Sequence, residues 1–155
     1  MRIIIQRVTE ADLAVDDQPH ASIGPGLVAL VGFQSRDADL PALLDKAAEK
    51  LLNLRVFRDD ADRMNRSLLD RAAASEPAGL LLVPNFTVAG STARGRRPSF
   101  DDAMPPDAAR PAFTDLVARV AALAPDALAV RSGVFGASMK VRLTNDGPVT
   151  LLVEL

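Results

Sequence analysis

Hydrophobic residues recur along the chain with two different spacings. Short apolar runs rich in Val, Ile and Leu at residues 2–8, 27–33 and 79–83 are typical of buried strands. In two longer stretches, about 40–53 and 109–123, apolar residues return every three or four positions, which predicts two amphipathic helices, the second introduced by residues 105–107 and ended by Pro125. The sequence therefore predicts a mixture of buried strands and two main helices.

The remaining apolar segments are short and are separated by turn residues, which indicates hairpins. We expect a hairpin around residues 16–19 and further strands at residues 54–57, 64–69, 127–131, 139–143 and 149–155. A turn at 144–148 is expected to join the last two strands, and the alanine-rich stretch 72–78 is interpreted as a linker. These elements predict an α+β fold, one domain over residues 1–155. Its sheets are expected to be mostly antiparallel, curved and barrel-like, with the two helices packed outside.

Composition removes several kinds of chemistry. The 155 residues are 48% hydrophobic, enough for a normal core, and include no cysteine. Disulfides, thiolate nucleophiles, iron–sulfur clusters and cysteine-ligated zinc are therefore excluded. The single histidine, His20, falls in the predicted hairpin and is interpreted as a partly exposed strand-end residue. A site for a hard metal held by carboxylates alone stays open as an alternative, but the acidic clusters at residues 59–62 and 101–102 are interpreted as turns and helix starts. We expect a protein without a metal site or cofactor, whose chemistry uses neither cysteine nor histidine.

The charge pattern is mild overall but concentrated at one place. A net charge of −2 argues against non-specific coating of nucleic acid such as DNA. Arg94, Arg96 and Arg97 nevertheless stand within four residues, and guanidinium groups suit bidentate contacts with phosphate. The alternatives are a solvated loop, or pairing with carboxylates such as Asp101. No apolar run is long enough to cross a bilayer and no signal-peptide pattern is present, so we expect a soluble protein without membrane contact.

Several segments are more specific than these patterns and carry a resemblance. They are Ile5-Gln6-Arg7-Val8, Asn53-Leu54-Arg55-Val56-Phe57, Phe86-Thr87, Arg94-Gly95-Arg96-Arg97-Pro98-Ser99-Phe100, Gly133-Val134-Phe135-Gly136-Ala137 and Asn145-Asp146-Gly147-Pro148-Val149-Thr150-Leu151. In this order and spacing they resemble the D-aminoacyl-tRNA deacylase (D-Tyr-tRNA deacylase) family, the chirality-proofreading enzymes of translation. The resemblance implies a cytoplasmic homodimer with its active site at the subunit interface. It also implies a substrate ester between a D-amino acid, or glycine, and the 3′-terminal adenosine of tRNA.

The resemblance further implies how the amino acid is selected. A Gly-Pro dipeptide with a cis bond, here Gly147 and Pro148, is expected to reach into the partner's pocket and to leave no room for an L side chain. A cis bond at X-Pro and close backbone approach at glycine are physically reasonable. Taken alone, the same dipeptide is an ordinary turn between two strands. Arg7 is implied to help hold the dipeptide beside the substrate.

A second family signature, a Ser-Gln-Phe-Thr-like segment, is implied to be catalytic. Here it reads Pro84, Asn85, Phe86 and Thr87. The backbone N–H groups of Phe86 and Thr87 are expected to hold the substrate carbonyl oxygen as it gains charge. Thr87 has no neighbouring base in the sequence to make it a nucleophile. The resemblance implies that the 2′-hydroxyl of the tRNA assists attack by water while the protein orients the ester.

Pro84 and Asn85 depart from the family pattern, which leaves two alternatives open. One is a related deacylase that acts on an L- or achiral aminoacyl-tRNA, and the other is a non-catalytic protein that binds the tRNA end. Further residues are implied to bind the substrate adenosine, with a core role as the alternative for the phenylalanine: Phe135, Gly136, Ala137 and Met139. Arg94, Arg96 and Arg97 are implied to contact tRNA phosphates.

Overall fold

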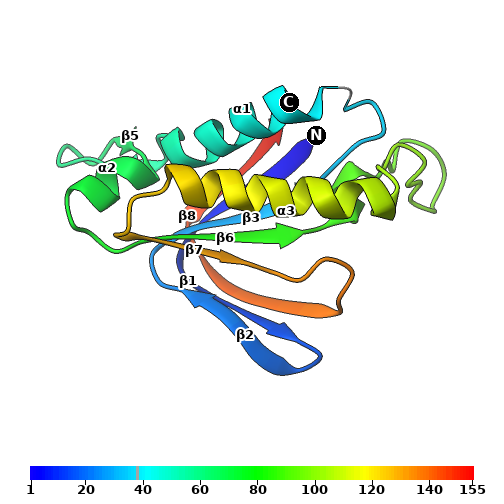
Figure 1. Ribbon diagram of the computed structural model, residues 1–155. Coiled ribbons are helices and arrows are strands. Elements are labelled where there is room, and N and C mark those ends of the chain that lie inside the picture. The colour runs from blue at the N-terminus through cyan, green and yellow to red at the C-terminus, as the bar shows by residue number, and fades with distance from the viewer. Residues whose placement is uncertain (38) are drawn as a thin grey trace.

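The computed structural model describes residues 1–37 and 39–155 (Figure 1). Its main sheet has the strand order β2-β1-β3-β6-β7, and β8 pairs with β1 outside this path. The strands are β1 (Arg2–Val15), β2 (Gln18–Ile23), β3 (Gly26–Gly32), β6 (Ala78–Pro84), β7 (Leu128–Ser132) and β8 (Met139–Glu154), with a separate hairpin of β4 (Phe57–Arg58) and β5 (Met64–Arg66). The helices are α1 (Leu40–Asn53), α2 (Leu68–Ala73), α3 (Pro106–Leu123) and the short 3₁₀ helix η1 (Phe86–Ala89).

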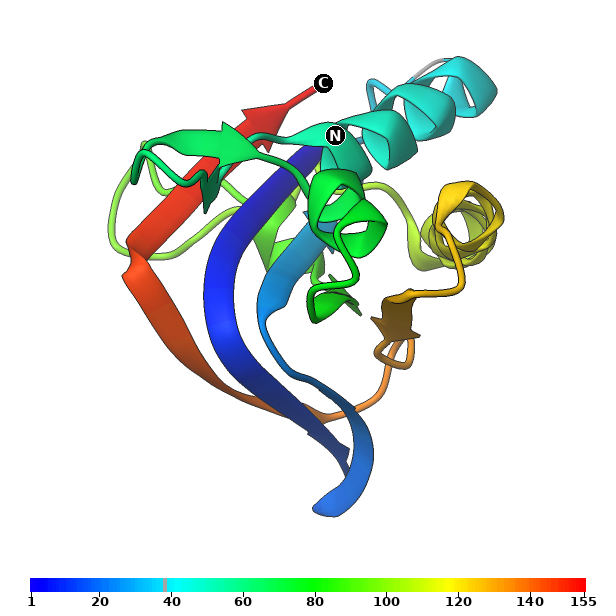
Figure 2. The same cartoon turned by 90° about the vertical axis from the view of Figure 1, so that its left-hand side faces the viewer.

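The long strand β1 gives the sheet its curvature. Its first half pairs with β3, its second half pairs with β2, and β8 runs antiparallel beside it along nearly its whole length. Figure 2 shows β1 and β8 curving together around the interior. The pairings of β6 with β3 and β7 are parallel, and the remaining ones are antiparallel. The expected α+β fold with a mostly antiparallel, barrel-like sheet is confirmed.

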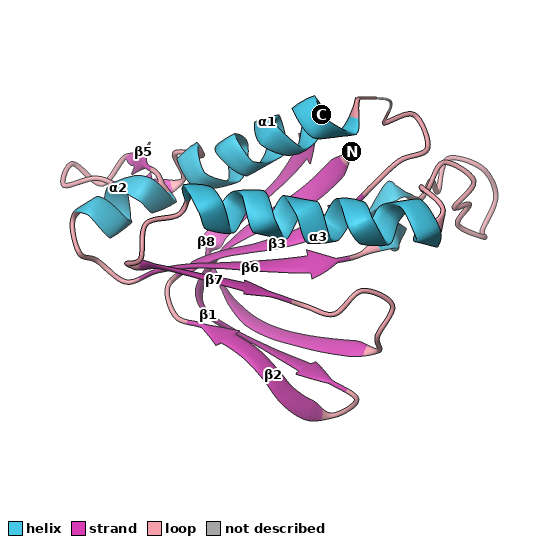
Figure 3. Cartoon of the chain, viewed as in Figure 1, coloured by secondary structure: helices cyan, strands magenta, loops and turns pink. Residues whose placement is uncertain are grey.

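The two long helices cover one face of this sheet, as Figure 3 shows. Strand β6 is apolar on both faces: Leu80 and Leu82 pack in the cluster under the helices, and Leu81 and Val83 pack in a second cluster on the other face. A strand buried on both faces has a continuous apolar run, which is what residues 79–83 show in the sequence. None of the helices in the described part of the chain is long and apolar enough to cross a membrane.

Residues 139–154 form one strand, so the prediction of two strands joined by a turn is wrong. Gln6 is paired with Thr150 and Val8 with Asn145, which leaves extra residues on β8 between these pairs. An excess of residues on one strand makes a bulge and does not reverse the chain. Gly147 and Pro148 lie in this bulge, and the peptide bond between them is cis.

The segment after β5 is helical, so the interpretation of residues 64–69 as strand and 72–78 as linker is also partly wrong. Helix α2 begins after Ser67, whose hydroxyl accepts a hydrogen bond from the Asp70 N–H at 3.1 Å. The Asp70 carboxylate accepts in return from the Ser67 N–H at 2.8 Å. This reciprocal capping box stabilises a helix start, and its Ser-x-x-Asp spacing is visible in the sequence.

Candidate active site

The turn after β6 is built by Asn85. Its N–H donates to the carbonyl of Val31 at 2.8 Å, and its side-chain Oδ1 accepts from both the N–H and the hydroxyl of Thr87, at 3.1 and 2.5 Å. Strand β3 approaches η1 closely at Gly32, where a Cβ would lie 2.9 Å from the Ala89 nitrogen. Glycine is therefore required there, and η1 is held firmly against the end of β3.

This arrangement changes the expected roles within the turn. The Thr87 hydroxyl is a donor to Asn85, and the Thr87 N–H is engaged by the same oxygen. An N–H that already has an acceptor is a poor first partner for a substrate oxygen. The Phe86 N–H, at the start of η1, is the better candidate for binding a carbonyl oxygen that gains charge.

A cavity of about 450 Å³ brings several of the predicted residues together. Pro84, Asn85 and Phe86 line it from the end of β6 and from η1, and Phe135 and Gly136 line it from the β7–β8 loop. These two segments lie about fifty positions apart in the sequence, and the fold brings them together. The lining is largely apolar, as expected for a site that binds a small ligand group.

One wall of the cavity is aromatic. The Phe86 side chain is 59% exposed, and its ring meets the ring of Phe100 edge to face with centroids 5.1 Å apart. A Cβ on Gly90 would lie 2.7 Å from the Phe100 ring, so a glycine is needed for this packing. Phe100 closes the arginine-rich segment in the sequence, but no pattern in the sequence assigns it to the site.

Arg110 is a second residue of the cavity that the sequence analysis missed. It belongs to α3, and its guanidinium stacks over the Phe135 ring at 4.9 Å from the centroid. Its Nη1 also donates to the Phe135 carbonyl at 3.1 Å. The helical pattern of α3 marks its buried residues, but no signal in the sequence says which exposed residue meets the β7–β8 loop.

Gly147 and Pro148 lie outside this cavity. With Arg7 they line another one of about 330 Å³, which shares no lining residue with the first. The Arg7 side chain is only 3% exposed, donates to the Val56 carbonyl at 2.5 Å, and lies 2.9 Å from the Asp146 carboxylate. Gly147 has φ +118°, and a Cβ there would lie 2.8 Å from Arg7 Nη2. Arg7, on β1, thus contacts the bulge of β8 and holds it in place.

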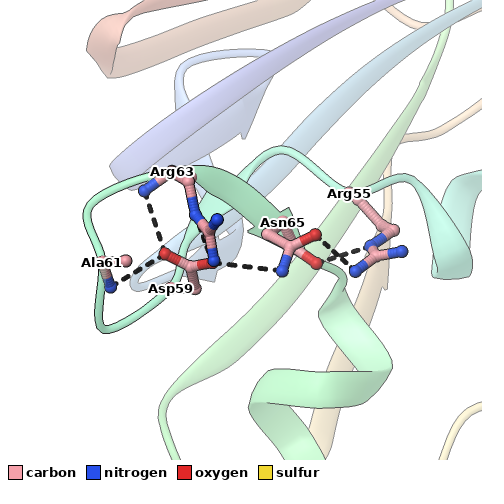
Figure 4. A network of polar contacts seen from close by, with 5 residues as sticks. All are labelled: Arg55, Asp59, Ala61, Arg63 and Asn65. Atoms are coloured by element: carbon pink, nitrogen blue, oxygen red, sulfur yellow. Dashed lines mark hydrogen bonds and ion pairs between the residues drawn. The ribbon is translucent and has the colours of Figure 1, made fainter.

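The β4–β5 hairpin borders this second cavity. A network of polar contacts in the hairpin also engages Arg55, from one of the sequence motifs (Figure 4). The Asp59 carboxylate accepts from the N–H groups of Ala61 and Arg63, at 2.9 and 3.0 Å, and from the Asn65 side chain at 3.1 Å. The N–H of Arg63 is the main cause that holds the pKa of Asp59 below its ordinary value. Arg55 donates in turn to the Asn65 carbonyl at 2.6 Å.

The remaining predicted residues lie in two places. Ala137 is in the β7–β8 loop and Met139 begins β8, whereas the three arginines are in an exposed loop. Ala137 donates its N–H to the Val134 carbonyl at 3.2 Å, and Met139 packs against the second core cluster, so neither lines the cavity of Asn85. Two backbone hydrogen bonds of 2.8 Å join Ser91 and Ser99 and close the loop between them. This loop exposes three guanidinium groups, and none of them pairs with a carboxylate among the described residues: Arg94, Arg96 and Arg97.

The acidic residues around the site neither pair with the loop arginines nor form a metal site in the described part of the chain. Asp101, the suggested partner of the loop arginines, accepts instead from the Ser99 hydroxyl at 2.8 Å. Within residues 1–37 and 39–155, no three His, Asp or Glu side chains are grouped in a way that could hold a metal ion. The groups that the site offers are therefore amides, aromatic rings and guanidinium ions.

Comparison with known proteins adds a family to this geometry. The sequence model of the D-Tyr-tRNA(Tyr) deacylase family matches residues 4–154. A D-aminoacyl-tRNA deacylase from Xanthomonas euvesicatoria pv. vesicatoria is 50% identical over 154 residues, 99% of each chain. Its counterpart from Carboxydothermus hydrogenoformans is 43% identical over 155 residues, the whole of both chains.

Two solved structures share the fold. A protein titled c-Myc DNA Unwinding Element Binding Protein superposes with a TM-score of 0.89 at 31% identity, over 100% of this chain and 99% of its own. A probable eukaryotic D-amino acid tRNA deacylase superposes with a TM-score of 0.79 at 22% identity, over 99% and 98% of the two chains. The curved sheet and its two covering helices are thus a known architecture.

Proposed function

This chain belongs to the D-Tyr-tRNA(Tyr) deacylase family, and we propose that it clears D-aminoacyl-tRNA, together with glycyl-tRNA, in the cytoplasm. Membership makes it a hydrolase of the aminoacyl-tRNA ester bond. The observation that carries the finer proposal is the cavity in which Asn85, Phe86 and Phe135 meet. It is large enough for a nucleoside and is edged by a backbone amide that can meet the ester carbonyl.

Catalysis in this proposal is mainly orientation. The Phe86 N–H binds the carbonyl oxygen as charge develops on it, and the 2′-hydroxyl of the terminal adenosine assists the attacking water. The Thr87 hydroxyl already donates to Asn85, which supports a role in holding the turn and not in attacking the ester. Phe135 and Gly136 receive the adenosine, and Ala137 and Met139 shape the loop that carries them.

Selectivity in this proposal needs a second copy of the chain. Gly147 and Pro148 are exposed and lie outside the cavity of their own chain, which supports their entering the cavity of a partner. Leu151 and Leu152, close by on β8, are 39% and 58% exposed and suit an apolar contact between copies. In the homodimer the dipeptide leaves no room for an L side chain. The loop of Arg94, Arg96 and Arg97 contacts tRNA phosphates near the rim at Phe100.

The test is hydrolysis of one tRNA charged in parallel with a D-amino acid, with its L-form and with glycine. We expect the D and glycyl esters to be lost quickly and the L ester to be spared. Replacing Pro148 with alanine should admit the L ester while keeping D hydrolysis within about tenfold of wild type, because the blocking wall is removed and the cavity is untouched.

Two other outcomes would replace the proposal. Cleavage of the L ester by the wild-type enzyme would favour altered selectivity. Pro84→Ser would then test whether the proline that stands in place of the family's serine is the cause. Protection of all three esters would instead favour a protein that binds the tRNA end without cleaving it.

A further inference from the structure

Arg110 differs from the other residues of the active-site cavity. Among the described residues that line it, Arg110 is the one with a charged side chain, and the others are apolar apart from the amide of Asn85. No carboxylate of the described residues forms an ion pair with it. A single cation without a counter-ion at the exposed rim of an apolar cavity favours a ligand that brings a negative charge to that rim.

The guanidinium is also held in place before any ligand arrives. The ring of Phe135 lies under it, and the Phe135 carbonyl accepts one of its five N–H groups. Gly136, with φ +82°, keeps the space beside it free, since a Cβ there would lie 3.3 Å from Nη2. The remaining N–H groups can therefore form a bidentate hydrogen-bonded contact with a ligand, and the side chain loses little further conformational entropy.

We propose that Arg110 binds the 5′-phosphate of the terminal nucleotide of the tRNA, an inference that rests on the proposed function. The carboxyl group of the amino acid is esterified in an aminoacyl-tRNA, so its phosphates are the anions that the substrate carries. The α-ammonium group is repelled by the guanidinium. The aminoacyl end therefore points toward Phe86 and the phosphate toward Arg110.

The experiment uses stable amide analogues in which D-alanine is joined to 3′-amino-3′-deoxyadenosine, with and without a 5′-phosphate. For the wild-type protein we expect the phosphate to strengthen binding about tenfold, as for a charge-assisted hydrogen bond. Arg110→Gln should lose this gain and bind the analogue without phosphate within about twofold of wild type. Arg110→Lys should retain part of the gain, because it keeps the positive charge but loses the planar guanidinium that forms bidentate contacts.

Arg131 offers a matched control. It is exposed, it donates to a backbone carbonyl, that of Val130, at 2.9 Å, and it lies on β7 outside the active-site cavity. Arg131→Gln should keep the full gain from the phosphate. An equal loss in both variants would overturn the proposal in favour of general attraction between the protein and anions.

Further outcomes also decide against the proposal. If Arg110→Gln weakens both analogues equally, Arg110 only positions Phe135. If inorganic phosphate binds as tightly as adenosine 5′-monophosphate, the site recognises free phosphate and not the terminal nucleotide. Hydrolysis of D-aminoacyl-tRNA is measured separately. A wild-type protein that cleaves no ester but keeps the tenfold gain would refute the proposed function and leave the role of Arg110 standing.

Discussion

At the scale of single residues, Asn85 and Thr87 have different roles: Asn85 holds the turn after β6 together, and Thr87 is held by it. One oxygen of Asn85 holds both the N–H and the hydroxyl of Thr87, and this pair of contacts fixes the turn that presents the Phe86 amide. The shortening from the family's glutamine to asparagine thus keeps an acceptor inside the turn. In the proposed mechanism the threonine side chain holds the turn, and the Phe86 amide binds the carbonyl oxygen of the substrate.

We therefore expect Thr87→Ala to lower kcat for a D-aminoacyl-tRNA by less than about tenfold, the cost of one neutral hydrogen bond. Asn85→Ala releases both contacts and misplaces the Phe86 amide, so a loss of about a hundredfold is expected. Single-turnover hydrolysis measures both, with Thr92→Ala in the exposed neighbouring loop as the control. Near-complete loss in Thr87→Ala with unchanged binding would return a chemical role to the hydroxyl.

At the scale of elements, α2 depends on its first turn. The N–H and hydroxyl of Ser67 both donate to the Asp70 carboxylate at 2.8 Å, and the N–H is the main cause that lowers the pKa of Asp70. A carboxyl whose pKa is lower in the folded protein stabilises the fold at pH values above its ordinary pKa of 3.8. That contribution disappears as the pH falls through the lowered value.

Asp70→Asn should accordingly reduce the free energy of unfolding by about 0.5–1 kcal/mol near neutral pH, in the lower range of capping effects because the carboxylate is exposed. The difference from wild type should shrink once the pH is below the lowered pKa. Urea unfolding across this pH range measures it. Asp107→Asn is the control, because Asp107 lies in the first turn of α3, where no side chain caps the helix. A difference that does not change with pH would contradict this account.

Strand β8 carries Gly147 and Pro148, the dipeptide to which the proposed function assigns selectivity. It pairs with β1 on both sides of its bulge, so the two flanks are fixed and the extra residues project outward. Arg7 reaches the bulge from β1 and ties it to the carbonyl of Val56. The projecting dipeptide is therefore mounted on two long paired strands, which gives it a defined position relative to the sheet.

At the scale of the whole molecule, the separation of the two cavities predicts that a single chain is an incomplete enzyme. We expect the wild-type protein to sediment as a dimer. Leu152→Asp, which replaces an exposed apolar side chain of β8 with a charged one, should sediment as a monomer that cleaves the L ester as well as the D ester. Leu123→Asp is the control, because Leu123 is similarly exposed, 52% against 58%, at the end of α3.

Thermal unfolding of both leucine variants shows whether each is folded. A wild-type monomer that spares the L ester, or a Leu152→Asp monomer with unchanged selectivity, would contradict the shared site. In that case the selectivity would have to arise within one chain.

The amino-acid sequence by itself determined the buried strands, the two long helices and the family. Apolar residues at strand and helix spacing must be buried whatever the final topology, and the motifs are local strings that need no structure to be compared. The capping pair Ser67 and Asp70 was also visible there, although the alanine-rich residues after it were interpreted as a linker. The absence of cysteine limited the chemistry in the same direct way.

Only the tertiary structure decided what lies next to what. The long pairing with β1 turned an expected turn at Gly147 and Pro148 into a bulge of one strand. The packing of α3 on the sheet placed Arg110 against Phe135, twenty-five positions further along the chain. Exposed positions carry no periodic signal of their neighbours, because the angle at which a helix packs is set by its buried face. The sequence therefore specified the parts of the site, and the curvature of the sheet and the packing of its helices specified their arrangement.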